Sequence, residues 1–548
     1  MLGLIQERPL LLTSLLDHAA TYHGAVEIVS RMADGGTHRY GYRDAHRRAR
    51  QLANALVGLG VRPSDRVATL AWNTHRHLEI QYAAAGVGAV CHPVNPKLTK
   101  EQIAFIINDA EDGCLFLDTS FAAVVADIRD RIPSVRQVVV LGDEAETAAC
   151  GIPGARSYES LLAGMDDRFA WVEADERNAV TLCYTSGTTG NPKGVLSSHR
   201  ACVLHAFLAR SSDLFDLSPG DSAMAVVPMY HANMSWGMPY AAAMAGAKLV
   251  LPGSRVDGAA LHRLIGEERV TRANGVPTIW LGMLSHLEQC GGTLPSLERI
   301  IIAGAAPAPS MIQTLEERHG VTVCHGWGMT ETGPFGTAGS MPGAVASQPP
   351  DQQRRHRVKQ GHGMYGVEMK IVDDKGVEQP RDGKSSGQLL VRGPWVLSGY
   401  FKGTGEASFT PDGWFVTGDV ATIDEIGFLQ LIDRSKDLVK SGGEWISSIE
   451  LENLAVGHPA VAEAAVIGVP HPTWGERPLL VVVRKPGALV EAAELRDFLA
   501  GHVAKWCVPD DVAFVAELPH SATGKIQKAE LRRWHQTGTL ITALAETR

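Results

Sequence analysis

Short β-rich runs alternate with amphipathic helical patterns through most of this 548-residue chain. Residues 66–72 (RVATLAW), 114–118 and 299–303 have the apolar, β-branched content of buried strands. Between such runs, apolar residues recur every three or four positions, as in residues 45–58 and 258–268, which predicts helices. Strands that alternate with helices form βαβ units, so we predict an α/β fold with large, mainly parallel sheets covered by helices.

The last third of the chain has a different pattern. Short strands within residues 368–417 predict a small β-barrel-like part, and the charged segment 433–437 then precedes a smaller α/β pattern. A chain of this length exceeds one ordinary domain. We predict an N-terminal domain of residues 1–433 and a mobile C-terminal α/β domain of residues 434–548. We interpret residues 337–363, rich in Gly, Ser, Pro and Gln, as a surface excursion.

Composition excludes several classes of protein. The net charge of −9 argues against a nucleic-acid-binding protein, whose surface would be basic. The eight cysteines include no C-x-x-C pair, which is typical of a reducing compartment. The 21 histidines show no H-E-x-x-H pattern and no Cys/His cluster, so no zinc site is expected. The chain has no apolar run near the ~20 residues of a membrane span and no signal peptide pattern, so we expect a cytoplasmic protein.

The segment YTSGTTGNPKG, residues 184–194, has the composition of a phosphate-binding loop. It follows a predicted strand, and it places four hydroxyl side chains and two glycines before a lysine. Glycines allow backbone N–H groups to approach a ligand, and hydroxyls and an ammonium complete an anion cradle. It is not a Walker A loop, because Gly follows the lysine. The candidate phosphate ligands are Thr185, Ser186, Gly187, Thr188, Thr189 and Lys193.

This loop resembles the signature of the adenylate-forming superfamily, which includes acyl-CoA synthetases, luciferases and the adenylation domains of peptide synthetases. Other segments match that family in the same order over nearly the whole chain. They are residues 304–307 (GAAP), 325–332 (HGWGMTET), 413–419 (GWFVTGD) and 523–528 (TGKIQK). The overall likeness is strongest to bacterial medium-chain fatty acyl-CoA ligases.

The resemblance implies an ATP site with Mg²⁺. Thr330 would contact the α-phosphate, and Glu331 would hold Mg²⁺ together with Thr185; magnesium prefers carboxylate and phosphate oxygens. Asp419 would accept from both ribose hydroxyls, and Arg434 would make a second nucleotide contact. The remaining implied nucleotide contacts are Gly304, Ala305, Ala306, Gly326, Trp327, Gly328 and Met329.

The resemblance also implies two half-reactions. A carboxylate attacks the α-phosphate of ATP to give an acyl-adenylate and pyrophosphate, and the thiol of coenzyme A then displaces AMP. Lys525 would neutralise charge that develops at the α-phosphate. Lys436 would be the hinge about which the small domain rotates between the steps. The thiol tunnel would be lined by Lys440, Gly442, Gly443 and Trp445.

The acid is indicated by residues 228–240 (PMYHANMSWGMPY), which resemble the acyl-site motif of fatty acyl-CoA ligases. The segment has no acidic residue to pair a substrate ammonium, which argues against an amino acid. His231 would position the carboxylate and Trp236 would gate the acyl tunnel, although packing alone also explains each. Asn233 and Gly237 complete the predicted acyl pocket.

The same segment departs from the fatty acyl pattern in Ala-Asn-Met-Ser-Trp and in Tyr230, which leaves chain length open. A medium-chain fatty acid is predicted, with methylthiopropionate and an aryl or branched acid as alternatives. An adenylation enzyme that loads a carrier-protein thiol, and a nucleotide sensor without catalysis, are further alternatives. Related enzymes are often dimers, so a homodimer is left open.

Overall fold

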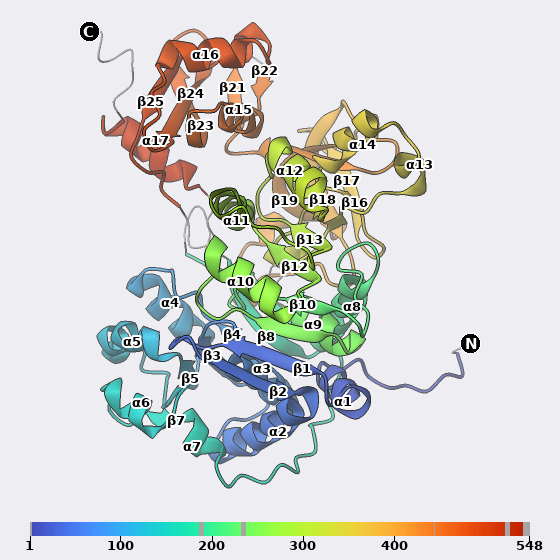
Figure 1. Cartoon of the computed structure of the whole chain (residues 1–548), viewed down its shortest axis with the longest axis vertical. Helices are drawn as coiled ribbons and strands as arrows, with labels where there is room; N and C mark the ends of the chain where they lie inside the picture. Colours follow the sequence, from blue (N-terminus) through green and yellow to red (C-terminus); the bar gives the residue numbers. More distant parts are fainter. Residues whose placement is uncertain (1–2, 186–190, 232–236, 443, 521–525, 541–548) are drawn as a thin grey trace.

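The computed structural model describes residues 3–185, 191–231, 237–442, 444–520 and 526–540, and Figure 1 shows how they are arranged. Two seven-stranded sheets form most of the molecule. The first contains β1 (Glu27–Arg31), β2 (Thr37–Gly41), β10 (Ser222–Met224), β11 (Lys248–Leu251), β12 (Arg272–Gly275), β13 (Arg299–Ile302) and β14 (Thr322–His325). The second contains β3 (Arg66–Leu70), β4 (Val90–Pro93), β5 (Cys114–Leu117), β6 (Gln137–Val140), β7 (Arg156–Ser157), β8 (Ala179–Thr185) and β9 (Lys193–Ser198).

The strand orders are β14-β13-β12-β10-β11-β1-β2 and β7-β6-β5-β3-β4-β8-β9. Within the described residues, the paired strands run parallel except for the edge pairs β1–β2 and β8–β9. The predicted α/β class with parallel-rich sheets is therefore confirmed. Strands such as β5 (CLFL) are apolar throughout because helices cover both faces of each sheet.

The helices of this part form layers on and between the two sheets. They are α1 (Thr13–Tyr22), α2 (Tyr42–Gly58), α3 (His75–Gly86), α4 (Lys100–Ala110), α5 (Ala122–Ile128), α6 (Glu144–Ala149), α7 (Tyr158–Leu162), α8 (His199–Arg210), α9 (Gly237–Ala245), α10 (Gly258–Glu268), α11 (Pro277–Cys290) and α12 (Pro309–His319).

Alternation along the strands divides the core into three. On β5, Phe116 points into a hydrophobic cluster formed by both sheets and by helices α1, α2, α3, α8 and α9. Its neighbours Leu115 and Leu117 point to the opposite face of the sheet, into a cluster covered by α4 and α5. On the first sheet, Ile300 and Ile302 face α10, α11 and α12. The helices of the shared cluster therefore lie between the two sheets, and the others cover the outer faces.

Helix ends follow local sequence signals. The Asp257 side chain caps α10 by accepting from the backbone N–H of Ala260 at 3.0 Å. Helix α11 begins with Pro277 and ends at Gly291, which has φ +66°. Proline fits the first helical turn and glycine the left-handed position after the last.

The segment interpreted as a surface excursion is partly ordered and buried, so that prediction is wrong in part. It contains β15 (Thr337–Ala338), α13 (Gly343–Ala346), α14 (Pro350–Arg357) and β16 (His362–Gly363). Thr337 is fully buried, and its hydroxyl accepts from the backbone N–H of Trp327 at 2.8 Å. The basic cluster is the last turn of α14, where cations favour the helix dipole.

Two smaller sheets follow. The first has the order β17 (Glu368–Val372), β18 (Ser386–Arg392), β19 (Phe415–Ile423) and β20 (Leu429–Arg434), all antiparallel. The second contains β21 (Val439–Ser441), β22 (Glu444–Ile446), β23 (Val461–His471), β24 (Gly475–Arg484) and β25 (Asp511–Phe514). It packs with α15 (Ser448–Val456), α16 (Ala492–Ala500) and α17 (Lys528–Gln536).

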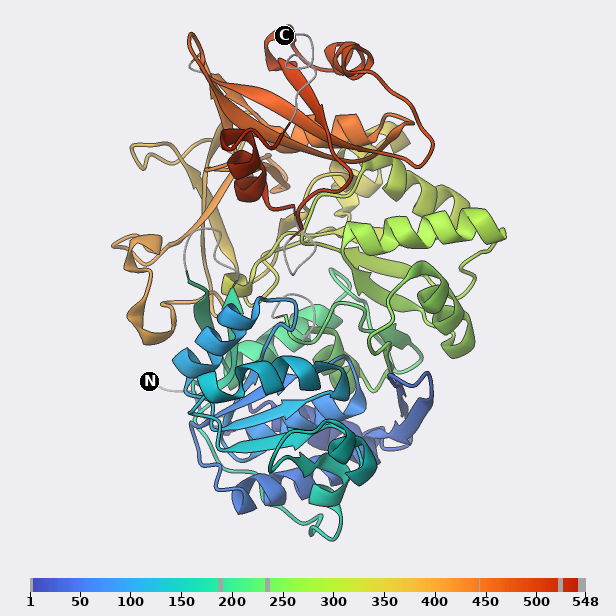
Figure 2. The same ribbon diagram turned by 90° about the vertical axis from the view of Figure 1, so that its left-hand side faces the viewer.

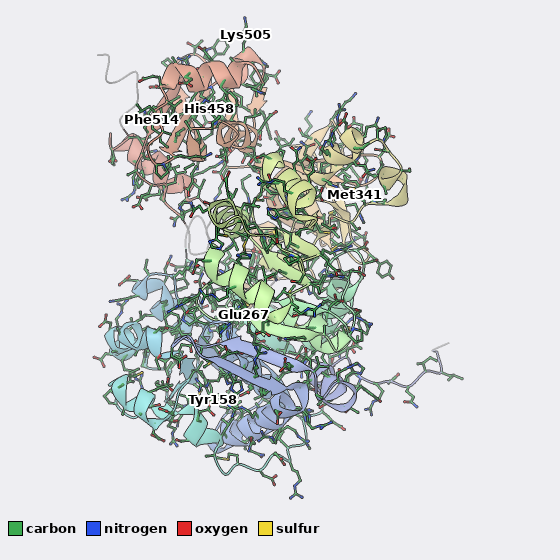
Figure 3. All side chains as sticks on the ribbon, in the orientation of Figure 1. Tyr158, Glu267, Met341, His458, Lys505 and Phe514 are labelled. Carbon is green, nitrogen blue, oxygen red and sulfur yellow. The ribbon has the colours of Figure 1, made fainter. Side chains whose placement is uncertain are left out.

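Figure 1 and Figure 2 both show this last unit at one end of the molecule; Figure 1 labels α2 and α7 at the opposite end. His458, Lys505 and Phe514 belong to it, whereas Tyr158 lies at the opposite end (Figure 3). Among the described residues, no helix combines the length and the apolar character that crossing a bilayer requires.

Candidate active site

The predicted phosphate loop joins two antiparallel strands. Strand β8 ends at Thr185 and β9 begins at Lys193, and these two residues are paired in the register. The Thr185 hydroxyl donates to the carbonyl of Lys193 at 3.5 Å. The structure therefore brings the two ends of the predicted loop together at one edge of the second sheet. The predicted contacts between them lie outside the described residues: Ser186, Gly187, Thr188 and Thr189.

A tyrosine that sequence reasoning missed links the loop lysine to the predicted magnesium ligand. Lys193 Nζ lies 4.9 Å from the centre of the Tyr400 ring, a favourable cation–π contact. The Tyr400 hydroxyl donates to Glu331 Oε1 at 2.8 Å. Burial, and then the Glu331 carboxylate, raise the pKa of Tyr400, so the phenol remains a neutral donor. Tyr400 lies in no recognised motif, so its role emerges only from contacts in the fold.

Glu331 is held in a buried turn. It belongs to the 3-10 helical turn Thr330–Thr332 and is only 6% exposed. The Thr332 hydroxyl accepts from the backbone N–H of Met329 at 3.0 Å and donates to the carbonyl of Pro334 at 3.0 Å. These bonds position the backbone of Thr330 and Glu331. One carboxylate oxygen of Glu331 is oriented by Tyr400, which is a suitable arrangement for a metal-ligating carboxylate.

The predicted adenine and phosphate segments follow neighbouring parallel strands. Ile302 of β13 and His325 of β14 are paired, and the N–H of Gly326 donates to the carbonyl of Ile302 at 3.0 Å. Ligands of open α/β sheets bind beyond the carboxyl ends of the strands. Two segments leave this edge of the sheet side by side. The segment after β13 carries Gly304, Ala305 and Ala306, and the segment after β14 carries Gly326, Trp327, Gly328 and Met329.

Glycine is required at two of these positions, at one by close backbone packing and at the other by its backbone conformation. A Cβ on Gly328 would lie 1.8 Å from the carbonyl oxygen of Pro334, far inside van der Waals contact. Gly304 has φ +91°, a conformation that other residues rarely adopt. A side chain at either position would displace the backbone that forms the predicted adenine site.

The predicted ribose ligand, Asp419, lies in a cluster of three hydrogen-bonded side chains. Asp419 is 2% exposed; its Oδ1 pairs with Arg434 Nε at 2.7 Å, and its Oδ2 accepts from Trp327 Nε1 at 2.8 Å. Asp419 and Arg434 are cross-strand partners on β19 and β20. A carboxylate offers about four lone-pair sites, so each oxygen retains one for a further donor such as a ribose hydroxyl. Three residues predicted separately from sequence thus meet in one cluster.

The predicted acyl pocket is described only in part, because Asn233 and Trp236 lie outside the described residues. His231 is half-buried, and its ring meets Tyr230 edge-on with centroids 4.7 Å apart. Gly237 begins α9, where a Cβ would lie 2.9 Å from the His205 ring.

His205 was not identified from sequence. Its ring stacks on Phe335 with centroids 5.0 Å apart, and burial lowers its pKa to about 3, so it is neutral at ordinary pH. Gly237 therefore lies against a flat, uncharged stack of rings that limits space on this side of the pocket.

The predicted hinge is held by α17. The Arg532 guanidinium donates to the carbonyl of Lys436 at 3.2 Å and to Asp437 Oδ1 at 2.6 Å. Burial is the main cause that lowers the pKa of Lys436. Lys525 lies outside the described residues, and α17 begins three positions after it, at Lys528.

The predicted coenzyme A segment forms a short hairpin of β21 and β22. Lys440 and Trp445 are paired across it, with Lys440 Nζ 5.7 Å from the centre of the Trp445 ring. Gly442 has φ +60°, and a Cβ there would lie 2.8 Å from the ring of Trp474. Gly443 lies outside the described residues. Trp445 of this hairpin and Trp474, in the turn between β23 and β24, are both half-exposed.

Comparison with known proteins agrees with this geometry. The family model "AMP-binding enzyme" matches residues 15–401, and the model "AMP-binding enzyme C-terminal domain" matches residues 450–525. The chain is 52% identical to the 3-methylmercaptopropionyl-CoA ligase of Ruegeria lacuscaerulensis over 97% of this chain and 98% of that protein. It is 47% identical to the medium-chain-fatty-acid–CoA ligase of Ectopseudomonas oleovorans, over 97% of each chain.

A solved structure of the anthranilate CoA ligase AuaEII with anthranoyl-AMP superposes with a TM-score of 0.87 at 26% identity. The match covers 97% of this chain and 99% of that one. The resemblance stated from sequence is thereby confirmed. The chain belongs to the AMP-binding enzyme family and is an AMP-forming acid–thiol ligase that uses ATP and coenzyme A to convert a carboxylic acid into its acyl-CoA.

Proposed function

We propose that the described residues form two halves of the ATP site. Lys193, Tyr400 and Glu331 would serve the phosphates, and Trp327, Asp419 and Arg434 would hold the nucleoside. The observation that carries this proposal is the pair of contact chains, Lys193–Tyr400–Glu331 and Trp327–Asp419–Arg434, which share the segment after β14. With acid and ATP held in line, the reaction needs positioning and charge stabilisation, and no protein nucleophile.

Further residues act on the phosphates and the acid. Lys193 and Thr185 bind phosphate oxygens beside the hydroxyls of the loop, and Thr330 donates to the α-phosphate. His231 positions the substrate carboxylate. Glu331 and Thr185 would hold Mg²⁺, whose charge offsets that of the phosphates when it is bound. Support comes from the buried Glu331 carboxylate, which is oriented by a neutral phenol.

We also propose that the chain divides at residues 433–434, and that the C-terminal unit rotates about Lys436 between the half-reactions. The supporting observation is that β20 ends at Arg434 in one sheet, whereas β21 begins at Val439 in another. In the thioester-forming orientation, the hairpin around Gly442 lines the path of the coenzyme A thiol. We further propose that the protein is cytoplasmic and that it forms a homodimer.

For the acid, we propose a medium-chain fatty acid. The supporting features are the apolar acyl segment and the relative of that name at 47% identity. A second candidate is 3-methylmercaptopropionate, because the Ruegeria ligase is 52% identical. Tyr230 favours this second candidate, since its buried hydroxyl has no hydrogen-bond partner among the described residues and could donate to a thioether sulfur.

A pyrophosphate-release panel tests these assignments. Straight-chain acids from acetate to dodecanoate, 3-methylmercaptopropionate, and branched and aromatic acids are compared by kcat/KM with ATP and coenzyme A present. We expect the highest value for a six- to ten-carbon acid. If 3-methylmercaptopropionate exceeds every straight-chain acid, and Tyr230→Phe lowers that preference, the second candidate replaces the first. A preference for an aromatic acid would contradict both.

The ribose assignment predicts a KM effect for Asp419→Asn. Asparagine keeps an acceptor for the Trp327 indole but removes the charge that strengthens bonds to ribose hydroxyls and to Arg434. Such bonds contribute about 1.5–3 kcal/mol, so we expect the KM for ATP to rise by about 10- to 150-fold while the KM for the acid stays unchanged. Asp412→Asn, at an exposed aspartate in the same part of the chain, is the matched control. Equal increases in both KM values would contradict a ribose-specific role.

A further inference from the structure

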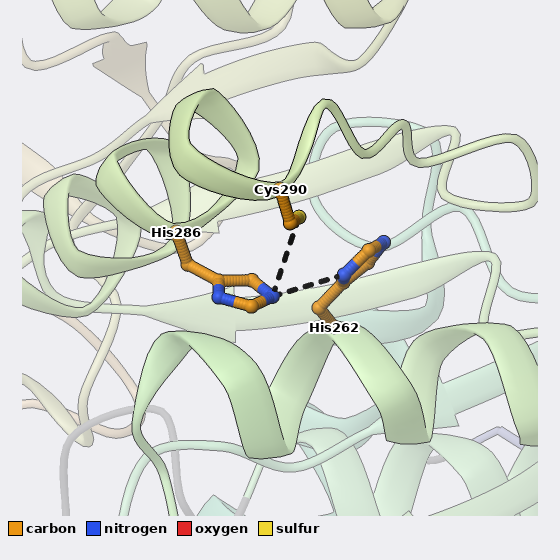
Figure 4. A group of neighbouring side chains, drawn as sticks. All are labelled: His262, His286 and Cys290. Atoms are coloured by element: carbon orange, nitrogen blue, oxygen red, sulfur yellow. Dashed lines mark hydrogen bonds between the residues drawn. The ribbon is translucent and has the colours of Figure 1, made fainter.

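Two neighbouring helices bring three metal-binding side chains together on the outer face of the first sheet (Figure 4). His262 lies on α10, and His286 and Cys290 lie one turn apart on α11. His262 Nδ1 is 3.2 Å from His286 Nε2, and His286 Nε2 is 3.6 Å from Cys290 Sγ. One donor atom from each of the three lies within 4.8 Å of the others.

These distances match the edges of a tetrahedral zinc site. With Zn–N of about 2.0–2.1 Å and Zn–S of about 2.3 Å, tetrahedral angles place two nitrogens about 3.4 Å apart and a nitrogen about 3.6 Å from a sulfur. Two of the three edges of the cluster, 3.2 Å and 3.6 Å, agree with these values to within about 0.2 Å. The side chains are therefore nearly in place for a metal before it binds.

The tautomer of His262 is set by a neighbouring carbonyl. His262 Nε2 lies 3.1 Å from the carbonyl oxygen of Thr293, which can only accept a hydrogen bond. Nε2 therefore carries the proton, and Nδ1 presents its lone pair to His286 and Cys290. Metal-ligating histidines almost always donate from their other ring nitrogen in this way.

Glycines after α11 make room for the cluster. Gly291 ends the helix, and a Cβ on Gly292 would lie 2.6 Å from His262 Cε1 and 3.0 Å from Cys290 Sγ. Gly258 lies at the start of α10, and a Cβ there would lie 2.5 Å from the carbonyl oxygen of Gly282 on α11, so helices α10 and α11 are in close contact. The close approach of α10 and α11 keeps the three side chains within reach of one ion.

We propose that His262, His286 and Cys290 bind one Zn²⁺ ion that joins α10 to α11, with a solvent molecule as the fourth ligand. Two imidazoles and a thiolate suit zinc and exclude magnesium, which requires oxygen ligands. Cys290 is exposed, which gives the ion a route of entry and leaves the fourth position open. This site is separate from Glu331 and Thr185, and it revises the expectation of no zinc site.

The ion would restrain a helix that begins near the nucleotide. Pro277, the first residue of α11, directly follows Val276, and Val276 Cγ1 is 3.3 Å from where a Cβ on Gly304 would lie. His286 and Cys290 lie toward the other end of this 14-residue helix, about 14 and 20 Å from Pro277 along the helix axis. Zinc would therefore stabilise α11 without contacting ATP.

The test uses the full chain, stripped with a chelator and kept reduced, in the absence of ATP. Zn²⁺ should bind at one ion per chain and raise the Tm by a few degrees. Co²⁺ in its place should give the d–d absorption of a tetrahedral site together with a thiolate-to-cobalt charge-transfer band. His286→Ala and Cys290→Ser should each weaken zinc binding by about 100-fold or more, since removing a ligand costs more than removing an outer-shell partner.

Cys150→Ser is the matched control, because Cys150 is a free cysteine outside the cluster, and it should leave zinc affinity unchanged. The substituted side chains are not fully buried, so folding is checked by the Tm of each metal-free variant. The proposal is overturned if Cys290→Ser binds zinc as tightly as the wild type, or if the cobalt complex lacks the thiolate band. Full zinc occupancy in a triple variant with His262→Ala, His286→Ala and Cys290→Ser would likewise place the ion elsewhere.

Discussion

Replacing Lys525 with alanine is expected to abolish most adenylate formation and to leave the second half-reaction intact. By resemblance, the ammonium of Lys525 neutralises charge that develops at the α-phosphate, and loss of one such preorganised group costs about 10²–10³-fold in rate. Thioester formation involves no attack at phosphorus, so coenzyme A should react with a supplied acyl-adenylate at close to the wild-type rate. Pyrophosphate release and acyl-CoA formation from synthetic acyl-AMP measure the two steps separately.

Lys485→Ala is the control for this experiment, because Lys485 is an exposed lysine of the same C-terminal unit. It should change neither half-reaction. A similar loss in both steps for Lys525→Ala would contradict a role confined to adenylate formation, and the proposed rotation about Lys436 would then rest only on the change of sheet between β20 and β21.

The sequence predicts the fold class well because the signals are local. Buried parallel strands are continuous apolar runs, as in β5 and β13. Helix α10 spans the predicted residues 258–268, and the Asp257 cap explains where it begins. The prediction for residues 337–363 is wrong in part because polar composition was taken to mean exposure. Thr337 and Gln360 are polar but buried, and both side chains are paired: the Thr337 hydroxyl donates to the backbone carbonyl of Gln360, and the Gln360 side chain accepts from the backbone N–H of Leu431.

The motifs of the site were predicted, but the residues that connect them were not. Tyr400 and His205 belong to no motif, and each acts through a neighbour distant in sequence, Glu331 or Gly237. The Cys/His cluster was missed for the same reason: His262 comes from a different helix than His286, so their spacing in sequence carries no signal. Patterns reveal residues that act within one segment, whereas contacts between segments require the fold.

A buried network of charged and polar side chains next to the proposed hinge has the largest expected effect on stability. Lys528 Nζ pairs with Glu452 Oε1 at 2.7 Å and donates to the Ser448 hydroxyl, which in turn donates to Asp433. The Lys528 and Glu452 side chains are only 11% and 16% exposed. Burial alone would lower the pKa of Lys528, but the carboxylates of Glu452 and Asp433 outweigh it and raise the pKa, so the lysine is charged. Lys528 thus joins α17 to α15 and to the end of β20.

Lys528→Ala should therefore destabilise the C-terminal unit by about 3–5 kcal/mol, because it leaves two buried carboxylates without their cation. Arg533→Ala is the matched control on the same helix: its pair with Glu530 is exposed, and its loss should cost at most about 1 kcal/mol. Denaturant unfolding, followed by tryptophan fluorescence, measures both. Lys528→Met combined with Glu452→Leu should recover much of the loss, since a well-packed apolar pair often replaces a buried ion pair at little cost. If Lys528→Ala costs no more than Arg533→Ala, the buried network does not stabilise the C-terminal unit.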